Sequence, residues 1–321
     1  MQSATAHSTR PAPSRTPTVH LARILCPTDA SEVSRHAREY AIALARWYGG
    51  EITGLTVLPG VPPAAALPEF APSLVMAEGA AGGGMERARE ALRGFLAPVG
   101  KAGIVTHALV EEGNPADHIL AAAERMPADL IVMGTHGLRG FERWLLGSVT
   151  ERVLRRATCP VLTVPRQAIA RAPEAQVLLE RLLCPVDFSP ASMRALDYAL
   201  SLAREAHAHL TVLYVLENVF GPISAGDVTF DAAAYMRFMM EDATARLRAA
   251  ISTDARSWCD IQEKVVAGDA YREILRVAKE DDTHMIVMGV HGRNAIDLMF
   301  FGSTTNHVVR DAACPVLSLR T

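Results

Sequence analysis

The sequence predicts an α/β protein of two tandem domains, each a doubly wound parallel sheet of five strands in the order 3-2-1-4-5. Its length of 321 residues suggests about two domains of ordinary size. Residues 133–164 recur in altered form as residues 288–319, a repeat far longer than the ~20 to 50 residues of solenoid and propeller units. Short apolar runs alternate with helical patterns in both halves. Such alternation implies parallel strands covered by helices on both faces.

The composition bounds the class of protein. Half of the residues are apolar, 21% are charged and the net charge is −3, which suffices for two ordinary cores and gives no large electric field. We therefore expect neither a nucleic-acid nor a membrane partner. No apolar run approaches the ~18 residues of a membrane span, and residues 1–20 lack the apolar core of a secretory signal. We expect a cytoplasmic protein in which residues 1–20 form a disordered tail.

The chain has five cysteines and no C-x-x-C pair. Four of them occupy equivalent positions in the two halves, Cys26 with Cys184 and Cys159 with Cys314. Each lies in or at the start of an apolar segment, which is typical of buried free thiols. We favour this interpretation over disulfides or zinc ligands.

Each half opens with a strand, a helix and a strand, over residues 21–57 and residues 179–215. In both, an apolar run is followed by a turn with an aspartate, by apolar residues at 3.6-residue spacing, and by a β-branched run. Ser31 and Ser189 are expected as N-caps of the helices, and Gly49 with the glycine after it should end the first helix.

The middle of each half varies more. Residues 58–84, rich in Pro, Gly and Ala, are expected to form a long loop with at most one short turn of helix, and residues 216–240 take the same place in the second half. We expect a helix and then a strand after each loop, at residues 85–102 and 104–110 in the first half and at residues 230–251 and 261–267 in the second.

The last part of each half contains two more helices and two more strands. Asn114 is expected as the N-cap of a helix with Pro115 at its first position. The apolar runs at residues 128–134 and 283–289 are typical of central parallel strands that are buried on both faces. A loop, a helix and a last strand complete each repeat.

In open parallel sheets, ligands bind outside the carboxyl ends of the strands, where the strand order reverses. Asp29 and Asp187 come just after the first strand of each half, and Gly134 and Gly289 just after the fourth. The predicted order makes these two strands neighbours. We therefore expect these residues to converge on one crevice in each domain.

The pattern G-x2-G-x9-G-[ST]-x-T occurs once in each half. Its residues are Gly134, Gly137, Gly147, Ser148 and Thr150 in the first half, and Gly289, Gly292, Gly302, Ser303 and Thr305 in the second. Glycines after a buried strand let backbone approach a ligand and supply positive-φ conformations. The Gly-Ser pair opens a helix whose free N–H groups and positive dipole end suit a phosphate chain. The alternative is that the hydroxyls cap the helix and the glycines form a tight loop.

Charged and titratable side chains beside this pattern do not indicate a catalyst. Arg139 and Arg143 have no basic counterpart in the second half, and Arg293 has none in the first. Arg139 and Arg293 are candidates for phosphate contacts, although such arginines are more often solvated surface residues. His136 and His291 lack an evident carboxylate or nucleophile nearby in the sequence, which favours loop histidines that bond to backbone over acid–base groups.

These features resemble a tandem universal stress protein of the ATP-binding branch, over about residues 21–319. The glycine pattern and the "CPTD" and "CPVD" openings of the two halves carry the resemblance. It implies two domains with the adenine nucleotide α-hydrolase-like fold, related by a pseudo-two-fold axis, at residues 21–166 and 178–321, with residues 167–177 as the linker. It also implies that the last strands, "CPVLTV" and "CPVLSL", pair within the chain as an internal pseudo-dimer, with or without a further homodimer.

The resemblance further implies an adenine nucleotide (ATP, ADP or AMP), with or without Mg²⁺, in each domain. Asp29 and Asp187 would hold the adenosine end, Val57 and Val215 would meet adenine through backbone groups, and the Gly-Ser-x-Thr segments would take the phosphates. The implied site residues are Pro27, Thr28, Asp29, Val57, Met133, Gly134, Gly137, Arg139, Gly147, Ser148, Val149 and Thr150 in the first half, and Pro185, Val186, Asp187, Val215, Met288, Gly289, Gly292, Arg293, Gly302, Ser303, Thr304 and Thr305 in the second.

We therefore expect an ATP-binding stress-response regulator with an unidentified protein partner, which hydrolyses ATP slowly or not at all. One rival is an enzyme of the adenine nucleotide α-hydrolase group, but the S-G-G-x-D-S type loop of that chemistry is absent after the first strand. The other rival is a dimeric stress adaptor without nucleotide, against which the intact patterns in both halves argue. The chain also lacks G-x4-G-K-[ST], a G-x-G-x-x-G after the first strand, and G-x-S-x-G.

Overall fold

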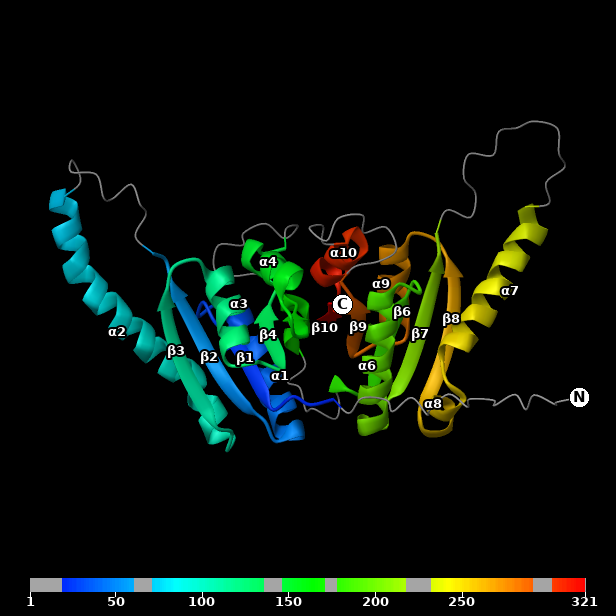
Figure 1. Ribbon diagram of the computed structural model, residues 1–321, viewed down its shortest axis with the longest axis horizontal. Coiled ribbons are helices and arrows are strands. Elements are labelled where there is room, and N and C mark those ends of the chain that lie inside the picture. The colour runs from blue at the N-terminus through cyan, green and yellow to red at the C-terminus, as the bar shows by residue number, and fades with distance from the viewer. Residues whose placement is uncertain are drawn as a thin grey trace, which may run out of the picture.

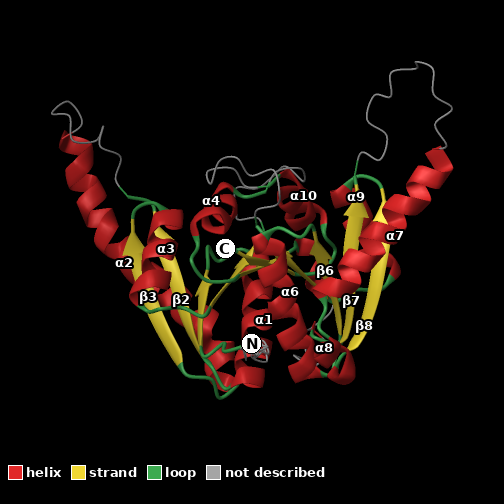
Figure 2. Ribbon diagram, turned by 45° about the vertical axis from the view of Figure 1, so that its right-hand side comes forward, coloured by secondary structure: helices red, strands yellow, loops and turns green. Residues whose placement is uncertain are grey.

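The computed structural model has a single twisted sheet with helices on both faces (Figures 1 and 2). Its described strands form a ten-stranded sheet in the order β3-β2-β1-β4-β5-β10-β9-β6-β7-β8. The structure describes residues 19–60, 71–135, 146–170, 178–217, 232–290 and 302–320, without the side chains of residues 71–82, 169, 170 and 232.

Strands and helices alternate along both halves. The first half contains β1 (Arg23–Pro27), α1 (Glu32–Tyr48), β2 (Glu51–Leu58), α2 (Ala71–Lys101), β3 (Thr106–Glu112), α3 (Pro115–Arg125), β4 (Leu130–Gly134), α4 (Ser148–Arg156), β5 (Val161–Val164) and the short 3-10 helix η3 (Arg166–Ala170). The second half contains β6 (Arg181–Val186), α6 (Pro190–Ala206), β7 (His209–Leu216), α7 (Ala232–Ala250), α8 (Thr253–Trp258), β8 (Asp260–Ala267), α9 (Ala270–Glu280), β9 (Met285–Gly289), α10 (Ser303–Asp311) and β10 (Val316–Leu319).

The predicted topology is confirmed. Each half has the strand order 3-2-1-4-5 with parallel neighbours. At the centre, β5 and β10 are antiparallel, with Leu162 opposite Leu317. The expected pairing of the two last strands is therefore present, and it joins the halves into one sheet.

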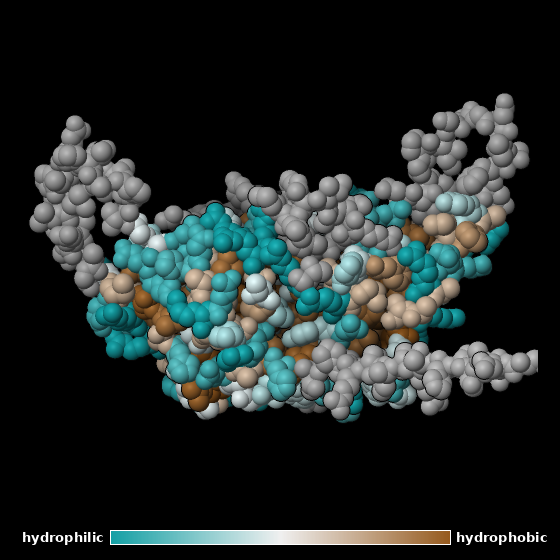
Figure 3. Space-filling view, in the orientation of Figure 1, coloured by the Kyte–Doolittle hydropathy of each residue, from teal (hydrophilic) through white to brown (hydrophobic). Residues whose placement is uncertain are grey.

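The core lies on both faces of the sheet, because successive side chains of a strand point to opposite sides. In β1, Ile24 and Cys26 belong to the apolar cluster under α1, α2, α6 and α7, whereas Leu25 belongs to the cluster under α3, α4, α9 and α10. Each cluster contains residues of both halves. The outer surface over α3 and α4 is hydrophilic (Figure 3), as expected of helices that bury one side only.

Several local signals are confirmed. Ser31 and Ser189 are N-caps, and each side-chain oxygen accepts a hydrogen bond from a first-turn N–H. Asn114 caps α3 with Pro115 at the first position. Helix α1 ends at Gly49, which adopts φ 65° in the left-handed region that glycine favours.

One expectation about the middle segments is wrong, and one element there was not predicted. Residues 71–84 belong to α2 and not to a loop, because a helix that is nucleated by its packed C-terminal part can extend through alanine-rich sequence despite glycines. The short helix α8 was not expected at all. It begins after Ser252, whose Oγ accepts a hydrogen bond from the Ala255 N–H (3.1 Å).

The chain ends and the cysteines complete the description. Residues 1–18 and 171–177 lie outside the described residues, and Val19 is buried. All five cysteines are free thiols; Cys26 and Cys184 are buried and the other three half-buried. Burial raises the pKa of the Cys26 thiol to about 12.

Across the described part of the chain, no helix has both the length and the apolar character that a membrane span requires.

Candidate functional site

The turn after β1 presents Asp29 at the carboxyl end of the sheet. Asp29 Oδ1 accepts a hydrogen bond from the Ser31 N–H (3.0 Å), and Ala30 between them adopts φ 64°. This Asx turn keeps the aspartate exposed. Beneath it, the buried hydroxyls of Thr28 and Ser34 lie 3.0 Å apart. The turn is therefore fixed from below, with its carboxylate at the rim of the sheet.

The turn after β6 repeats this geometry with different neighbours. Asp187 Oδ1 accepts a hydrogen bond from the Ser189 N–H (3.0 Å), and Phe188 adopts φ 61°. The Asp187 N–H donates to Ser192 Oγ (3.2 Å). Ser192 and its counterpart Ser34 are not among the predicted site residues, although a Ser-x-x-Ser repeat in both halves marks them.

The backbone of Val57 lies beyond the point where β1 stops pairing with β2. The ladder ends at Leu55, whose carbonyl accepts the Thr28 N–H (2.8 Å). The backbone carbonyl of Leu58 points toward β3, because it accepts a hydrogen bond from the Gly113 N–H (2.8 Å). Alternate residues of a strand direct their N–H and C=O groups to opposite neighbours. Val57 therefore directs its backbone groups to the side of β1, next to the aspartate turn.

Val215 has the equivalent position in the second half. The ladder between β6 and β7 ends with Val186 opposite Tyr214. The Leu216 carbonyl accepts the Gly268 N–H (3.0 Å) at the end of β8. Both residues expected at the adenine thus lie at the rim of their sheet, beside the turn that carries the aspartate.

Helices α4 and α10 begin beside the ends of β4 and β9. Their N-caps are Gly147 and Gly302, with φ −58° and −53°, and a glycine has no side chain that could cap its helix. Ser148 and Ser303, at the first helical positions, are exposed. The N-cap position of each helix is therefore a glycine, and the serine and threonine of the pattern lie inside the first turn. The positive ends of two helix dipoles face the crevice.

Two buried threonines hold these helices on the strands below them. Thr150 Oγ1 donates to the Gly134 carbonyl (3.0 Å), and Thr305 Oγ1 donates to the Gly289 carbonyl (3.1 Å). Both side chains are buried. The repeated threonine thus positions the start of each helix through the backbone at the end of the fourth strand.

The glycines that end β4 and β9 are explained by close packing of a helix and not by a positive φ. A Cβ on Gly134 would lie 2.6 Å from Val33 Cγ1, and one on Gly289 would lie 2.7 Å from the backbone carbon of Ala191. The missing side chain therefore lets the first turns of α1 and α6 pack on these strands. The expected positive φ is wrong for both glycines, since the described glycines with positive φ are Gly49, Gly103, Gly113 and Gly268.

The remaining predicted site residues form three groups. Side chains buried in the strands belong to Pro27, Met133, Pro185, Val186 and Met288. Half-buried residues at the second helical positions are Val149 and Thr304. Outside the described residues lie Gly137, Arg139, Gly292 and Arg293, and so do Arg143, His136 and His291, which are not among the predicted site residues.

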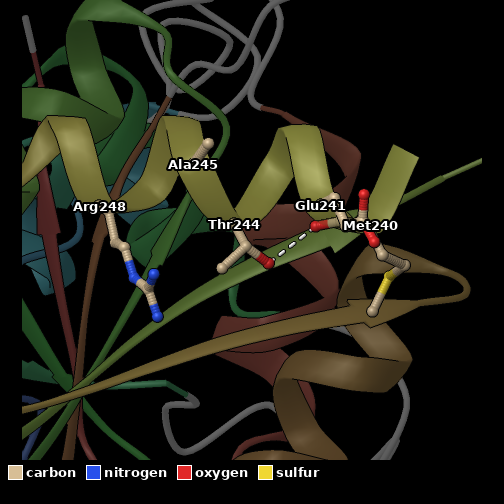
Figure 4. A pocket seen from close by; sticks show the side chains of 5 residues that line it. All are labelled: Met240, Glu241, Thr244, Ala245 and Arg248. Carbon is tan, nitrogen blue, oxygen red and sulfur yellow. Dashed lines mark hydrogen bonds between the residues drawn. The ribbon is translucent and has the colours of Figure 1, made fainter. Parts of the chain in front are cut away.

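A shallow hollow on the surface follows α7 (Figure 4). It is lined by Met240, Glu241, Thr244, Ala245 and Arg248. Thr244 Oγ1 donates to the Met240 carbonyl of its own helix (2.7 Å). None of the residues predicted to bind nucleotide lines it.

Comparisons with known proteins agree with this architecture. In solved structures, a universal stress protein from Archaeoglobus fulgidus superimposes with a TM-score of 0.65, is 26% identical, and covers 94% of this chain and 97% of its own. Universal stress protein MJ0531 of Methanocaldococcus jannaschii is 40% identical over 149 residues, which are 45% of this chain and 82% of that protein. Universal stress protein Rv2005c of Mycobacterium tuberculosis is 28% identical over 194 residues, 60% of this chain and 62% of that protein.

The family profile described as the universal stress protein family matches twice, at residues 20–165 and 179–320. The two matches coincide with the two five-stranded halves of the sheet. The chain therefore belongs to the universal stress protein family, with two copies of its fold in tandem.

Proposed function

We propose that this protein binds one adenine nucleotide in each half and acts as a nucleotide-dependent regulator of a stress response. The observation that carries the proposal is the start of α4 and of α10, each with a glycine as N-cap, beside the aspartate turn of the neighbouring strand. The arrangement occurs twice in one chain. An anion at the start of a helix is stabilised by the backbone N–H groups and by the helix dipole.

The crevice offers different chemistry at its two ends. At one end, the carboxylate of Asp29 or Asp187 is an acceptor for ribose hydroxyls, and the backbone of Val57 or Val215 supplies a donor and an acceptor for adenine. At the other end, Ser148 or Ser303 and the N–H groups of the first helical turn receive phosphates. A nucleoside phosphate matches both ends, with ATP, ADP or AMP, and Mg²⁺, as candidates of this class.

We propose that hydrolysis, if any, is slow. Fast phosphoryl transfer needs a positioned nucleophile and concentrated positive charge on the transferring group. Residues 133–156 and 288–311 contain no lysine, and hydroxyls and N–H groups bind the ground state as well as the transition state, which adds affinity without rate. ATP turnover of about one per second or more with Mg²⁺, lost when the site is blocked, would favour the α-hydrolase enzyme instead.

The test replaces the first residue of each helix by a glutamate. Ser148→Glu and Ser303→Glu place a carboxylate where the phosphates should bind, yet a negative charge in the first turn stabilises a helix. Wild-type protein should bind two ATP per chain in a calorimetric titration; each single variant should keep one site of wild-type affinity, and the double variant none. Each blocked site should weaken by at least about tenfold, since one charge-assisted hydrogen bond contributes about 1.5 to 3 kcal/mol.

Ser148→Ala and Ser303→Ala are the matched controls. They remove the hydroxyl without adding charge, so they should weaken binding much less than the glutamates do. A double glutamate variant that still binds two ATP with the wild-type affinity contradicts the proposed phosphate sites.

A further inference from the structure

The second crevice contains an aromatic residue in an unfavourable backbone conformation. Phe188 follows Asp187 in the Asx turn and adopts φ 61°. Residues with a side chain are uncommon in this left-handed region, and a bulky one remains there only when its surroundings hold it. The contacts of the Phe188 ring therefore help to fix the turn that carries the aspartate.

Two other elements hold this ring. The Phe188 and Tyr214 ring centroids are 4.9 Å apart at an interplanar angle of 39°. Tyr214 is buried at the end of the ladder between β6 and β7. Arg246 of α7 places its guanidinium carbon 4.4 Å from the centroid of the Phe188 ring, well within the range of a cation–π interaction. The turn is thus linked to α7 through one side chain.

The described part of the first half shows no such link. Ala30 follows Asp29 as Phe188 follows Asp187, and Ala30 has no ring to contact. Among the described residues of this half, a cation–π pair joins Arg38 of α1 to Phe95 of α2, with 5.2 Å between the guanidinium carbon and the ring centroid. That pair does not include the turn after β1. The residue after the first aspartate therefore makes no cation–π contact of the kind that Phe188 makes with Arg246.

We propose that Arg246 is a positioning residue for the second nucleotide site, and that it couples occupancy of this site to α7. The proposal rests on the proposed function, because the aspartate turn is its adenosine end. Arg246 holds the Phe188 ring, the ring holds the turn, and the turn presents Asp187 in its binding geometry before the nucleotide arrives. The two sites are consequently not equivalent, since among the described residues the second turn alone is held by an aromatic ring under an arginine of a neighbouring helix.

Thermodynamic linkage adds a second consequence. If Arg246 strengthens nucleotide binding by some factor, nucleotide binding strengthens the contact of α7 with the turn by the same factor. Amide hydrogen exchange in α7 should therefore slow when ATP fills the second site. Exchange in α2 over residues 83–101, where the side chains are described and show no such link to the first turn, should not respond to ATP at the first site.

The test uses the Ser148→Glu chain, in which ATP can bind the second site only. In this background we expect Arg246→Gln and Phe188→Leu each to weaken ATP binding about two- to tenfold, because both remove the cation–π contact. Arg246→Lys, which keeps the charge over the ring, should stay within about twofold. Thermal melts of each variant check that the chain is folded.

The matched control uses the Ser303→Glu chain, in which only the first site binds. There Arg38→Gln removes the other cation–π pair and should leave ATP affinity unchanged. Parent-like affinity of both Arg246→Gln and Phe188→Leu overturns the role of Arg246 while the proposed function stands. A Ser148→Glu parent that binds no ATP at its second site overturns both proposals.

Discussion

The glycines that end the fourth strands show how one atom decides local packing. At Gly289 the space that a Cβ would fill is occupied by backbone of α6, whereas at Gly134 it is occupied by a methyl group of Val33. Backbone cannot move aside cheaply, but a side chain can be shortened. In both halves a glycine is needed here so that a helix can pack on the strand. The first half should tolerate a larger residue once Val33 is shortened, whereas the second half should not.

This difference is a prediction. Gly289→Ala should lower the free energy of unfolding by about 1 to 3 kcal/mol through overpacking. Gly134→Ala should do the same in the wild-type chain, but Val33→Ala, which gives the first half the residue that the second has as Ala191, should rescue most of that loss. Urea denaturation of the single and double variants measures it. Equal losses for Gly134→Ala with and without Val33→Ala would mean that the crowding lies elsewhere.

The sequence identified these glycines but not their reason. Repetition in both halves singles out Gly134 and Gly289, yet spacing cannot distinguish a glycine that admits a ligand from one that admits a helix. The same limit applies to Thr150, a predicted phosphate ligand whose hydroxyl also donates to a backbone carbonyl. Only three-dimensional neighbours decide such cases.

At the scale of elements, the sequence predicted the alternation, the strand order and most of the caps. These depend on local chemistry, such as the Ser31 and Asn114 caps, or on rules for parallel sheets. The start of α2 and the existence of α8 were missed, because alanine-rich and short polar segments have weak local preferences that the neighbouring structure overrides. The resemblance predicts that the backbone of Val57 in β2 meets adenine. The direction of its N–H and C=O groups, toward the side of β1, follows from the fold, because β1 stops pairing with β2 before Val57.

The titratable carboxylate of Asp129 joins the start of β1 to the start of β4. Arg23 donates to Asp129 from its backbone N–H (2.9 Å) and from its guanidinium (2.9 Å). Burial alone would raise the pKa of Asp129, but the hydrogen bonds and charge of Arg23 outweigh it and leave this pKa below its ordinary value. The second half has His284 at this position.

A lowered pKa stabilises the fold at pH values above the unfolded pKa of about 3.9, and this stability is lost as the pH falls through the folded pKa. Asp129→Asn should therefore be less stable than wild type at pH 7, and the difference should shrink as the pH falls below about 4. Urea denaturation between pH 7 and pH 3 measures it. Asp117→Asn, which alters an exposed pair with Arg156, is the control and should change stability little at any pH. A difference that stays constant with pH would exclude the Asp129 carboxylate as its source.

At the scale of the whole molecule, the two halves share their core. The antiparallel pair β5 and β10 continues the sheet through the centre, and both apolar clusters contain residues from each half. The helices α1 and α6 also meet near the centre (Figure 2). Neither half can therefore lose its structure without exposing apolar surface of the other, which favours unfolding as one unit.

A hydrogen bond between the C-terminal ends of α1 and α6 also joins the two halves. The Tyr48 hydroxyl donates to Glu205 Oε2 (2.7 Å), and the Val19 N–H donates to Glu205 Oε1 (3.0 Å). Burial, together with the hydrogen bond to Glu205 and its charge, raises the pKa of Tyr48 above its ordinary value, so the hydroxyl keeps its proton and remains a donor. One carboxylate of the second half thus receives two donors from the first.

This contact gives the last prediction, a double-mutant cycle across the two halves. Glu205→Ala leaves the half-buried Tyr48 hydroxyl without this acceptor, and should cost about 1 to 3 kcal/mol of unfolding free energy. Tyr48→Phe removes the donor, so adding Glu205→Ala to it should cost clearly less, with a coupling of about 1 kcal/mol between the two substitutions. Urea denaturation should show a single transition for all four proteins. Strictly additive losses would show that the hydrogen bond contributes nothing, and two separate transitions in the wild-type chain would show that the halves unfold independently despite their common sheet.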